Sequence, residues 1–416
     1  MEPLHALSFA LHKQLLQKKM DVFQPWAARL PTAYLLKERA PFSSMPMLAS
    51  TSLQSKLRER SCDLLAQLQP FLLAANNSNL NGENADVLSI DYAIVVDEEK
   101  GWDLRLVEFQ SFTSVLTSCF LLHQTYVEMW PELKAHFPWQ TLACAHGETQ
   151  EQAWLNQCRA WVAGEGAILL ERNPESFKTY FDLLAASHVW NAPILSPEEL
   201  IAAFDCKENE KPAAQKNQNI RKVLNRFIGD QSNLINLTKP TKPTKPNTPA
   251  SSSDMDLQAK LQNLPVTWHS HPAWYWAINK GTACELDLQH EPKNVLASAW
   301  RSLGLAAEQL VAKHIHSFGS QHIKLHPTEQ ELDDLPDPHN WIVQPRFSSY
   351  PIMKNEAGDD LYGEIRLIVQ LKPNGEHWTA MQFARLFHGQ TAGANHMQGR
   401  TLEGVSLVYN YDKTAA

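Results

Sequence analysis

The segment Leu104-Arg105-Leu106-Val107-Glu108-Phe109-Gln110 alternates in polarity and carries an acid and an amide two positions apart. Such alternation is typical of a β-strand, in which side chains repeat with a period of two. Glu108 and Gln110 are therefore expected on one face of the strand, and Arg105 on the other. Carboxylate and amide oxygens are ligands that Mg²⁺ accepts. The segment predicts a strand that carries a metal-binding pair.

The residues before this strand predict a hairpin. Residues 90–96 (IDYAIVV) form a second strand-like run, and the polar residues between the two runs are typical of a turn. If Asp97 pairs with Trp102, Asp91 falls directly opposite Glu108. Like charges in opposite positions destabilise a sheet, so this pair requires a cation or a shared proton.

Composition limits the classes of function. The chain has 416 residues, of which 44% are hydrophobic, and this size predicts two or three domains. A formal net charge of -8 argues against a nucleic-acid partner. The six cysteines form no CxxC pair, so neither a zinc ribbon nor a disulfide framework is expected. Without a signal peptide or an apolar run of about 18 residues, we expect a cytoplasmic protein with no membrane partner.

The pattern along the chain indicates helices first and then a small α/β unit. Charges and leucines at helical spacing in residues 56–73 predict a helical beginning. A strand at 166–171, a helix at 174–187 and an apolar run at 193–195 predict a unit with a parallel sheet. Further helices are expected at 116–129, 150–163 and 294–303.

The segment 239–253 (KPTKPTKPNTPASSS) has almost no apolar residues and therefore predicts a flexible linker or loop insertion. A partner-docking motif is the less favoured interpretation of its repeated KPT. Beyond it the apolar pattern returns, and Asn374-Gly375 between two apolar runs predicts a second hairpin. Glu364 and Arg366 share a face of the first strand of that hairpin.

Two further segments carry cations beside loops of small residues. Lys313 ends a short apolar run just before Ser317-Phe318-Gly319-Ser320, where it can meet phosphate oxygens as a point charge. Arg385 precedes a loop that contains Asn395, and an arginine can clamp a phosphate while an asparagine ligates a metal. A structural turn is the alternative for Asn395. No Walker loop, GxGxxG or GxSxG motif occurs, and the histidine pairs lack a third ligand at fixed spacing.

Taken in order, these segments resemble the ATP-grasp superfamily, in a circularly permuted arrangement like that of glutathionylspermidine-synthase-type and related bacterial proteins. The hairpin from Asp91 to Gln110 is similar to an acidic hairpin that ends in an E-x-N or E-x-Q metal pair and comes last in unpermuted enzymes. Residues 168–179 resemble the small α/β domain of permuted members. Residues 271–280 and 341–346 resemble the start of the grasp region and the strand leading to the adenine-side hinge.

The resemblance implies an α+β or α/β fold: a permuted ATP-grasp core, a small α/β domain and a helical N-terminal segment. The expected parts are a helical segment at 1–85, the hairpin and a helix completing the core at 86–135, the small α/β domain at 136–206, a connection at 207–262 and the nucleotide-binding domain at 263–416.

The resemblance also implies ATP and Mg²⁺ as cofactors and assigns site residues. The implied metal ligands are Asp91, Glu108, Gln110, Glu364 and Asn395. The implied nucleotide-binding residues are Lys280, Lys313, Ser317, Gly319, Ser320 and Gln344. The implied catalytic cations are Arg366 and Arg385. Gln110 replaces the commoner asparagine, Asn395 stands where an acid is often found, and the phosphate loop is poor in glycine.

The implied activity is that of a carboxylate-amine ligase that joins a small-molecule carboxylate to an amine through an acyl phosphate. Three alternatives remain open at this point. In the first, the site is catalytically decayed and the chain binds nucleotides or partners. In the second, the chain is a small-molecule kinase that uses the same ATP site. In the third, the charged residues make structural ion pairs.

Overall fold

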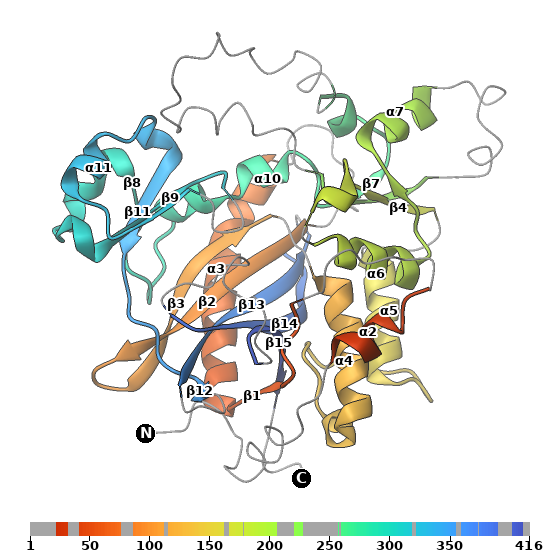
Figure 1. Ribbon diagram of the computed structural model, residues 1–416. Coiled ribbons are helices and arrows are strands. Elements are labelled where there is room, and N and C mark those ends of the chain that lie inside the picture. The colour runs from red at the N-terminus through yellow and green to blue at the C-terminus, as the bar shows by residue number, and fades with distance from the viewer. Residues whose placement is uncertain are drawn as a thin grey trace.

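A seven-stranded mixed sheet lies at the centre of the structure (Figure 1). The computed structural model describes residues 22–31, 41–75, 86–111, 115–161, 166–177, 179–205, 220–227, 257, 259–317, 322–354, 359–372, 374–389 and 402–410. The strand order is β1-β15-β14-β13-β2-β3, with β12 paired to β13. The strands are β1 (Met47–Ala49), β2 (Asp86–Asp97), β3 (Gly101–Gln110), β12 (Met353–Lys354), β13 (Asp360–Leu371), β14 (His377–Phe387) and β15 (Gly404–Asn410). β1 and β15 run parallel, and the other pairs are antiparallel.

The predicted hairpin is present, with a correction to its register. Asp97 pairs with Gly101, and Val96 rather than Asp97 pairs with Trp102. The register shifts by one between Asp91 and Tyr92, so Asp91 nevertheless lies opposite Glu108, as predicted. The bulge adds an extra residue to β3 and thereby offsets the one-residue error at the turn.

The same bulge overturns the predicted orientation of Arg105. Arg105 pairs with Ala93 and Glu108 pairs with Asp91. Residues in direct opposition share a face of the sheet, and Asp91 and Ala93 are two apart on one strand. Arg105 and Glu108 therefore lie on the same face, because an unpaired residue between them resets the alternation.

Helices pack with this sheet in the largest hydrophobic core. α3 (Thr51–Ala75) is the long helix of the N-terminal segment, and the short α2 (Phe23–Ala27) contacts α4 (Leu116–Met129). α5 (Gln150–Trp161) is fixed by the indole of Trp154, which donates to the carbonyl of Ala380 on β14 at 2.6 Å. The strand β1 was not expected in the helical N-terminal segment, where its three buried residues extend the sheet.

A parallel sheet of order β5-β4-β6-β7 forms a second layer with its own core. Its strands are β4 (Ala167–Leu170), β5 (Ile194–Leu195), β6 (Lys222–Asn225) and β7 (Thr267–His269). The parallel pairing was predicted, but β6 and β7 lie beyond the expected boundary at residue 206. The predicted helix at 174–187 is instead a 3₁₀ turn, η2 (Pro174–Ser176), followed by α6 (Tyr180–Trp190), which ends at the left-handed Asn191. α7 (Pro197–Asp205) follows β5.

A third sheet of order β10-β9-β11-β8, called the small sheet below, has a separate core. This sheet and the short helices that pack on it are called the small domain, which is distinct from the small α/β domain expected at 136–206. Its strands are β8 (Val295–Leu296), β9 (Leu310–His314), β10 (Ile323–Leu325) and β11 (Trp341–Pro345). The predicted helix at 294–303 begins later, as the 3₁₀ helix η5 (Ala297–Leu303) that ends at the left-handed Gly304. The other short helices are η1 (Pro131–Ala135), α10 (Trp274–Ala277), η4 (Lys280–Cys284), η6 (Ala307–Gln309), α11 (Glu329–Asp333) and η7 (Pro338–Asn340).

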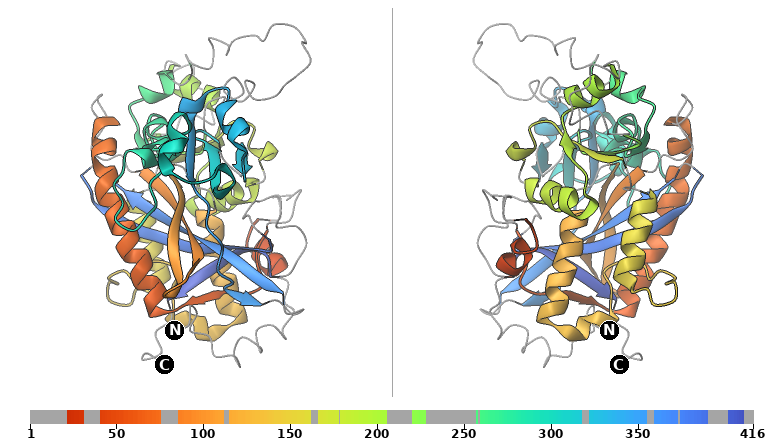
Figure 2. Two further views of the ribbon diagram at one scale, coloured as in Figure 1. Left: turned by 90° about the vertical axis from the view of Figure 1, so that its left-hand side faces the viewer. Right: turned by 90° about the vertical axis from the view of Figure 1, so that its right-hand side faces the viewer.

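Figure 2 shows both smaller sheets at the same end of the large sheet. Among the described residues, no helix combines the length and the apolar character that a membrane span requires. The tract 239–253 lies outside the described residues.

Candidate functional site

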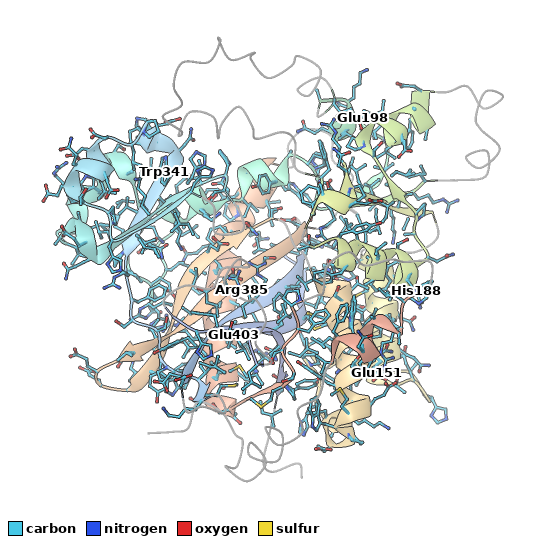
Figure 3. All side chains as sticks on the ribbon, viewed as in Figure 1. Glu151, His188, Glu198, Trp341, Arg385 and Glu403 are labelled. Carbon is cyan, nitrogen blue, oxygen red and sulfur yellow. The ribbon has the colours of Figure 1, made fainter. Side chains whose placement is uncertain are left out.

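Charged side chains from four neighbouring strands meet on one face of the large sheet. Asp91 on β2 pairs with Glu108 on β3 and with Arg366 on β13. Glu364, two residues before Arg366, pairs with Arg385 on β14. Because paired residues share a face, all five project from the same side of the sheet. Figure 3 shows Arg385 near the middle of the molecule, over the large sheet.

Asp91 is the central acceptor of this cluster. Arg366 donates to its two oxygens from Nε and Nη2, at 2.6 Å each, and Arg385 Nη2 donates to Oδ2 at 2.6 Å. Burial acts to raise the pKa of Asp91, but the two guanidinium groups outweigh it and hold the pKa below its ordinary value. Asp91 is thus an ionised carboxylate that positions two arginines.

Glu364 is less well compensated. Its Oε2 accepts from Arg385 Nη2 at 2.6 Å. Burial raises the pKa of Glu364, Arg385 opposes that shift, and the neighbouring carboxylates of Asp91 and Glu108 add to it. Arg385 Nε is buried and has no hydrogen-bond partner in the described part of the chain. Glu364 is therefore the acid of the cluster most ready to hold a proton, and Arg385 keeps an unused donor.

Two lysines reach the cluster, one from the small sheet and one from the short helix η4. Lys313 on β9 donates to the carbonyl of Val107 at 2.9 Å, and Val107 is the residue left unpaired by the bulge in β3. Lys280, at the start of η4, lies 3.5 Å from Glu108 Oε2 and donates to the carbonyl of Ser317. Burial lowers the pKa of Lys313, although Glu108 acts in the opposite direction. Burial acts to raise the pKa of Glu108, but Lys280 and the other cations keep it below its ordinary value.

The charges of this site sum to a small positive excess. Its carboxylates are Asp91, Glu108 and Glu364, and its cations are Lys280, Lys313, Arg366 and Arg385. With every group ionised, four positive charges minus three negative charges leave +1. Cations that are buried together attract anions strongly, because little water screens them. The arrangement suits an anionic ligand such as a phosphate chain.

The small sheet adds two apolar side chains, Val311 and Ile342, beside Lys313. Lys313 pairs with Ile342, and Val311 pairs with Gln344, so these four side chains share one face of the sheet. All four are buried. The opposite face of β9 and β11 packs on the core of the small domain through residues such as Ala312. Val311 and Ile342 beside the cation of Lys313 fit a ligand that has a flat ring and an anionic tail.

Of the other predicted site residues, Gln110 and Ser317 lie beside the charged cluster and three lie outside the described residues. Gln110 pairs with Ser89 at the end of β3, on the face that carries Glu108. The hydroxyl of Ser317 donates to the carbonyl of His314 at 2.8 Å, while its own carbonyl accepts from Lys280. Gly319, Ser320 and Asn395 lie outside the described residues.

The predicted metal site fits the described residues only in part. In the ranges that the structure covers, no group of three or more His, Cys, Asp or Glu side chains is arranged to hold a metal ion. Both oxygens of Asp91 accept hydrogen bonds from guanidinium groups, which leaves little of the carboxylate for a metal, and its role as a metal ligand stays a prediction. Glu108 has only the 3.5 Å ion pair with Lys280 among these residues, and Glu364 uses one oxygen. Glu108, Glu364 and Gln110 keep oxygens that suit Mg²⁺.

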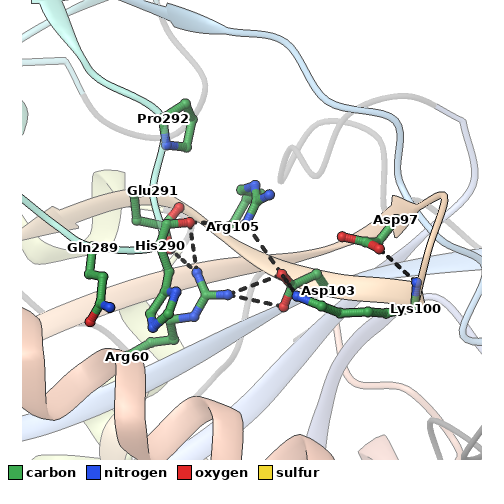
Figure 4. A pocket seen from close by; sticks show the side chains of 9 residues that line it. All are labelled: Arg60, Asp97, Lys100, Asp103, Arg105, Gln289, His290, Glu291 and Pro292. Carbon is green, nitrogen blue, oxygen red and sulfur yellow. Dashed lines mark hydrogen bonds and ion pairs between the residues drawn. The ribbon is translucent and has the colours of Figure 1, made fainter.

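A surface pocket of about 400 Å³ lies at the outer edge of β3 (Figure 4). Arg60 of α3 donates to both oxygens of Asp103 and to the carbonyl of His290, and Glu291 Oε2 accepts the edge amide of Leu106 at 2.8 Å. These contacts clamp the segment that leads into the small domain. No sequence motif indicated this pocket, because its partners lie some 230 positions apart.

Comparisons with known proteins address the fold. No family model matches the chain, and no curated protein matches it in sequence. The fold resembles that of a glutathione synthetase-like effector. That structure, of the protein from Globodera pallida in its apo form, superposes with a TM-score of 0.53 over 96% of this chain and 97% of that chain, at 10% sequence identity. At that identity the likeness concerns the fold alone.

Proposed function

We propose that this chain is an ATP- and Mg²⁺-dependent carboxylate-amine ligase with a permuted ATP-grasp-like fold. One observation carries the proposal: four cations from η4, β9, β13 and β14 surround the acids of the β2–β3 hairpin, between the large sheet and the small sheet. The overall likeness to a glutathione synthetase-like effector supports the fold part of the proposal.

The charge of the site explains how such a reaction would be promoted. In the first step a carboxylate oxygen of one substrate attacks the γ-phosphorus of ATP, and the bond from that phosphorus to the bridging oxygen breaks to release ADP. Both reactants are anions, so their approach is opposed by repulsion. Lys313, Arg366 and Arg385 would offset this repulsion at the transferring oxygens. Asp91 acts as a positioning residue, because it fixes both guanidinium groups.

In the second step the amine nitrogen attacks the acyl carbon, and phosphate leaves with the electron pair of the broken C–O bond. The nitrogen then loses a proton. Glu364, whose pKa is raised by burial, would accept that proton. When bound, Mg²⁺ would neutralise phosphate charge, held by Glu108 and Gln110.

Isothermal titration with Mg-ATP tests the proposal directly. We expect the wild-type chain to bind with a dissociation constant below about 1 mM, and Lys313→Met to weaken binding about 10- to 100-fold, because a charge-assisted contact contributes about 1.5 to 3 kcal/mol. Lys324→Met, which removes a lysine from the small sheet away from the cluster, is the matched control. No binding of Mg-ATP to the wild-type chain at millimolar concentration would overturn the proposal.

A second candidate is a nucleotide-binding protein without ligase activity. It is favoured by the occupation of both Asp91 oxygens, which leaves fewer acids for a metal. ADP release from Mg-ATP in the presence of a mixture of carboxylates and amines distinguishes the two. An amide product supports the ligase, a phosphoester indicates a kinase, and nucleotide binding without ADP release supports the second candidate.

A further inference from the structure

Asp86 is a buried carboxyl group that no cationic side chain compensates among the described residues. It begins β2 and is fully buried. Its Oδ1 accepts from the Ser111 hydroxyl at 2.5 Å and from the Val87 amide at 2.8 Å. Its Oδ2 is buried and has no hydrogen-bond partner within the described ranges. Burial raises the pKa of Asp86 to about 6. The Ser270 hydroxyl acts to lower the pKa of Asp86, but no donor of the described chain makes a hydrogen bond of normal geometry to Oδ2.

The three other buried aspartates of the described chain are each paired with a cation. Asp91 contacts Arg366, Asp103 contacts Arg60, and Asp182 contacts Arg226 at 2.8 Å. An ionised carboxylate without such a partner is costly in a protein interior, and the structure therefore requires either a proton or a cationic ligand at Asp86.

The surroundings of Asp86 contain further unused polar groups. Ser270, just after β7, has a left-handed backbone with φ of 64° and accepts the Val87 amide through Oγ at 3.3 Å. Gln370 on β13 pairs with Val87, so its side chain lies on the face opposite to that of Asp86; it is fully buried, its Nε2 has no partner in the described chain, and its Oε1 accepts from His269 Nε2 at 2.5 Å. A positive φ is unfavourable for serine, and such strain is concentrated at functional sites. Burial lowers the pKa of His269 to about 3, so its ring is neutral and supplies no cation.

We propose that Asp86, with the hydroxyls of Ser111 and Ser270, binds the ammonium group of a substrate. An ammonium group carries three donors and one positive charge, which satisfy the unpartnered Oδ2 and compensate the carboxylate. This inference rests on the proposed ligase function, because it names a feature of the amine substrate.

The held ammonium is not the reacting nitrogen. Ser111 is three residues beyond Glu108, which corresponds to roughly 10 Å along a strand, and the odd separation turns the two side chains to opposite faces of the sheet. A protonated nitrogen that is ion-paired to a carboxylate has no free electron pair for attack on an acyl phosphate. The substrate therefore carries a second polar end besides its ammonium group. An amino acid and a diamine both have this chemistry.

Binding of small amines to the full-length chain tests the proposal. The ligands titrated isothermally into the chain at pH 8 are 1,4-diaminobutane, alanine and butylamine. Butylamine has an ammonium group but no second polar group. We expect 1,4-diaminobutane or alanine to bind the wild-type chain, and the one that binds identifies the source. Asp86→Asn should weaken that binding at least tenfold. Glu98→Gln, which removes an exposed acid at the hairpin turn, should leave it unchanged. If none of the three ligands binds, or if Asp86→Asn binds equally well, Asp86 holds only a proton and the proposal is overturned.

Two measurements separate this result from other failures. Asp86→Asn should bind Mg-ATP as the wild-type chain does, so loss of amine binding alone is specific to the ammonium site. Amine binding by a chain that does not bind Mg-ATP would support the ammonium site and overturn the ligase function. Ser270→Gly relieves the left-handed backbone and removes one hydroxyl, and it should fold and weaken amine binding at least threefold. Unchanged amine binding by a folded Ser270→Gly would remove Ser270 from the site.

Discussion

Arg366 donates two parallel hydrogen bonds of 2.6 Å to Asp91, the residue directly opposite it in the sheet. Removing one partner of a buried pair leaves an uncompensated charge. We therefore expect Arg366→Ala to lower the free energy of unfolding by about 3 to 5 kcal/mol. Arg366→Lys keeps the charge but lacks the planar fork, so its loss should be intermediate. Urea denaturation measures both. A loss below about 1 kcal/mol for Arg366→Ala would show that water or Arg385 compensates Asp91.

Glu108→Ala separates activity from stability. The ion pair of Glu108 with Lys280 is largely buried but long, at 3.5 Å, so removal of the carboxylate should lower the free energy of unfolding by about 1 to 3 kcal/mol, less than Arg366→Ala. ADP release should fall by about 100-fold or more, because the oxygen beside the phosphates is lost. ADP release at the wild-type rate would remove Glu108 from the site. Glu98→Gln is a control for the change of net charge.

The stability contributed by Asp86 depends on pH. Its pKa is raised from 3.8 to about 6 in the folded chain, so the folded state holds the proton more tightly than the unfolded state does. This contribution is fully present below pH 3.8 and is lost as the pH rises through 6. The groups facing Asp86 are the neutral Ser111, Ser270 and Val87 amide.

Asp86→Asn removes this titration. Relative to the wild-type chain, the variant should gain about 1 to 2 kcal/mol of unfolding free energy between pH 5 and pH 7.5. Urea denaturation at the two pH values measures the difference. An equal effect of the substitution at both pH values would mean that Asp86 has an ordinary pKa.

The clamp at the edge of β3 should protect one backbone amide from exchange. Glu291 Oε2 accepts the amide of Leu106 at 2.8 Å, and Glu291 Oε1 pairs with Arg60 at 3.1 Å. Glu291→Ala leaves that edge amide without its acceptor, so hydrogen exchange at Leu106 should become at least tenfold faster. Glu285→Ala, an exposed acid of the same segment, is the control. Unchanged exchange at Leu106 would show that the clamp does not stabilise the edge.

The local elements could be predicted where the pattern was long and uniform. The helix at 116–129 and the strands around Asp91 and Glu108 are observed as expected, because period and turn chemistry act over a few residues. Short elements were less predictable. The helix expected at 174–187 is divided, since Asn173 adopts a left-handed conformation and Pro174 begins a 3₁₀ turn. The strand β1 has only three residues and gains its stability from β15.

The opposition of Asp91 and Glu108 was expected from the wrong turn register. Two features that alternation does not reveal, a tighter turn and a bulge at Val107, cancel to give the same pair. The bulge also provides the carbonyl that Lys313 contacts. A bulge is set by the twist of the whole sheet and by packing on both faces, which a strand's own sequence does not specify.

The sequence by itself determined which charged residues are available, that Glu108 and Gln110 share a strand face, and that Glu364 and Arg366 share another. These follow from strand periodicity, which is local. The tertiary structure alone decided that Arg366 and Arg385 occupy the carboxylate of Asp91, and that Asp86 has no cation beside it. Those facts depend on which strands pair across 275 positions of sequence, and on the burial that gives each charge its energy.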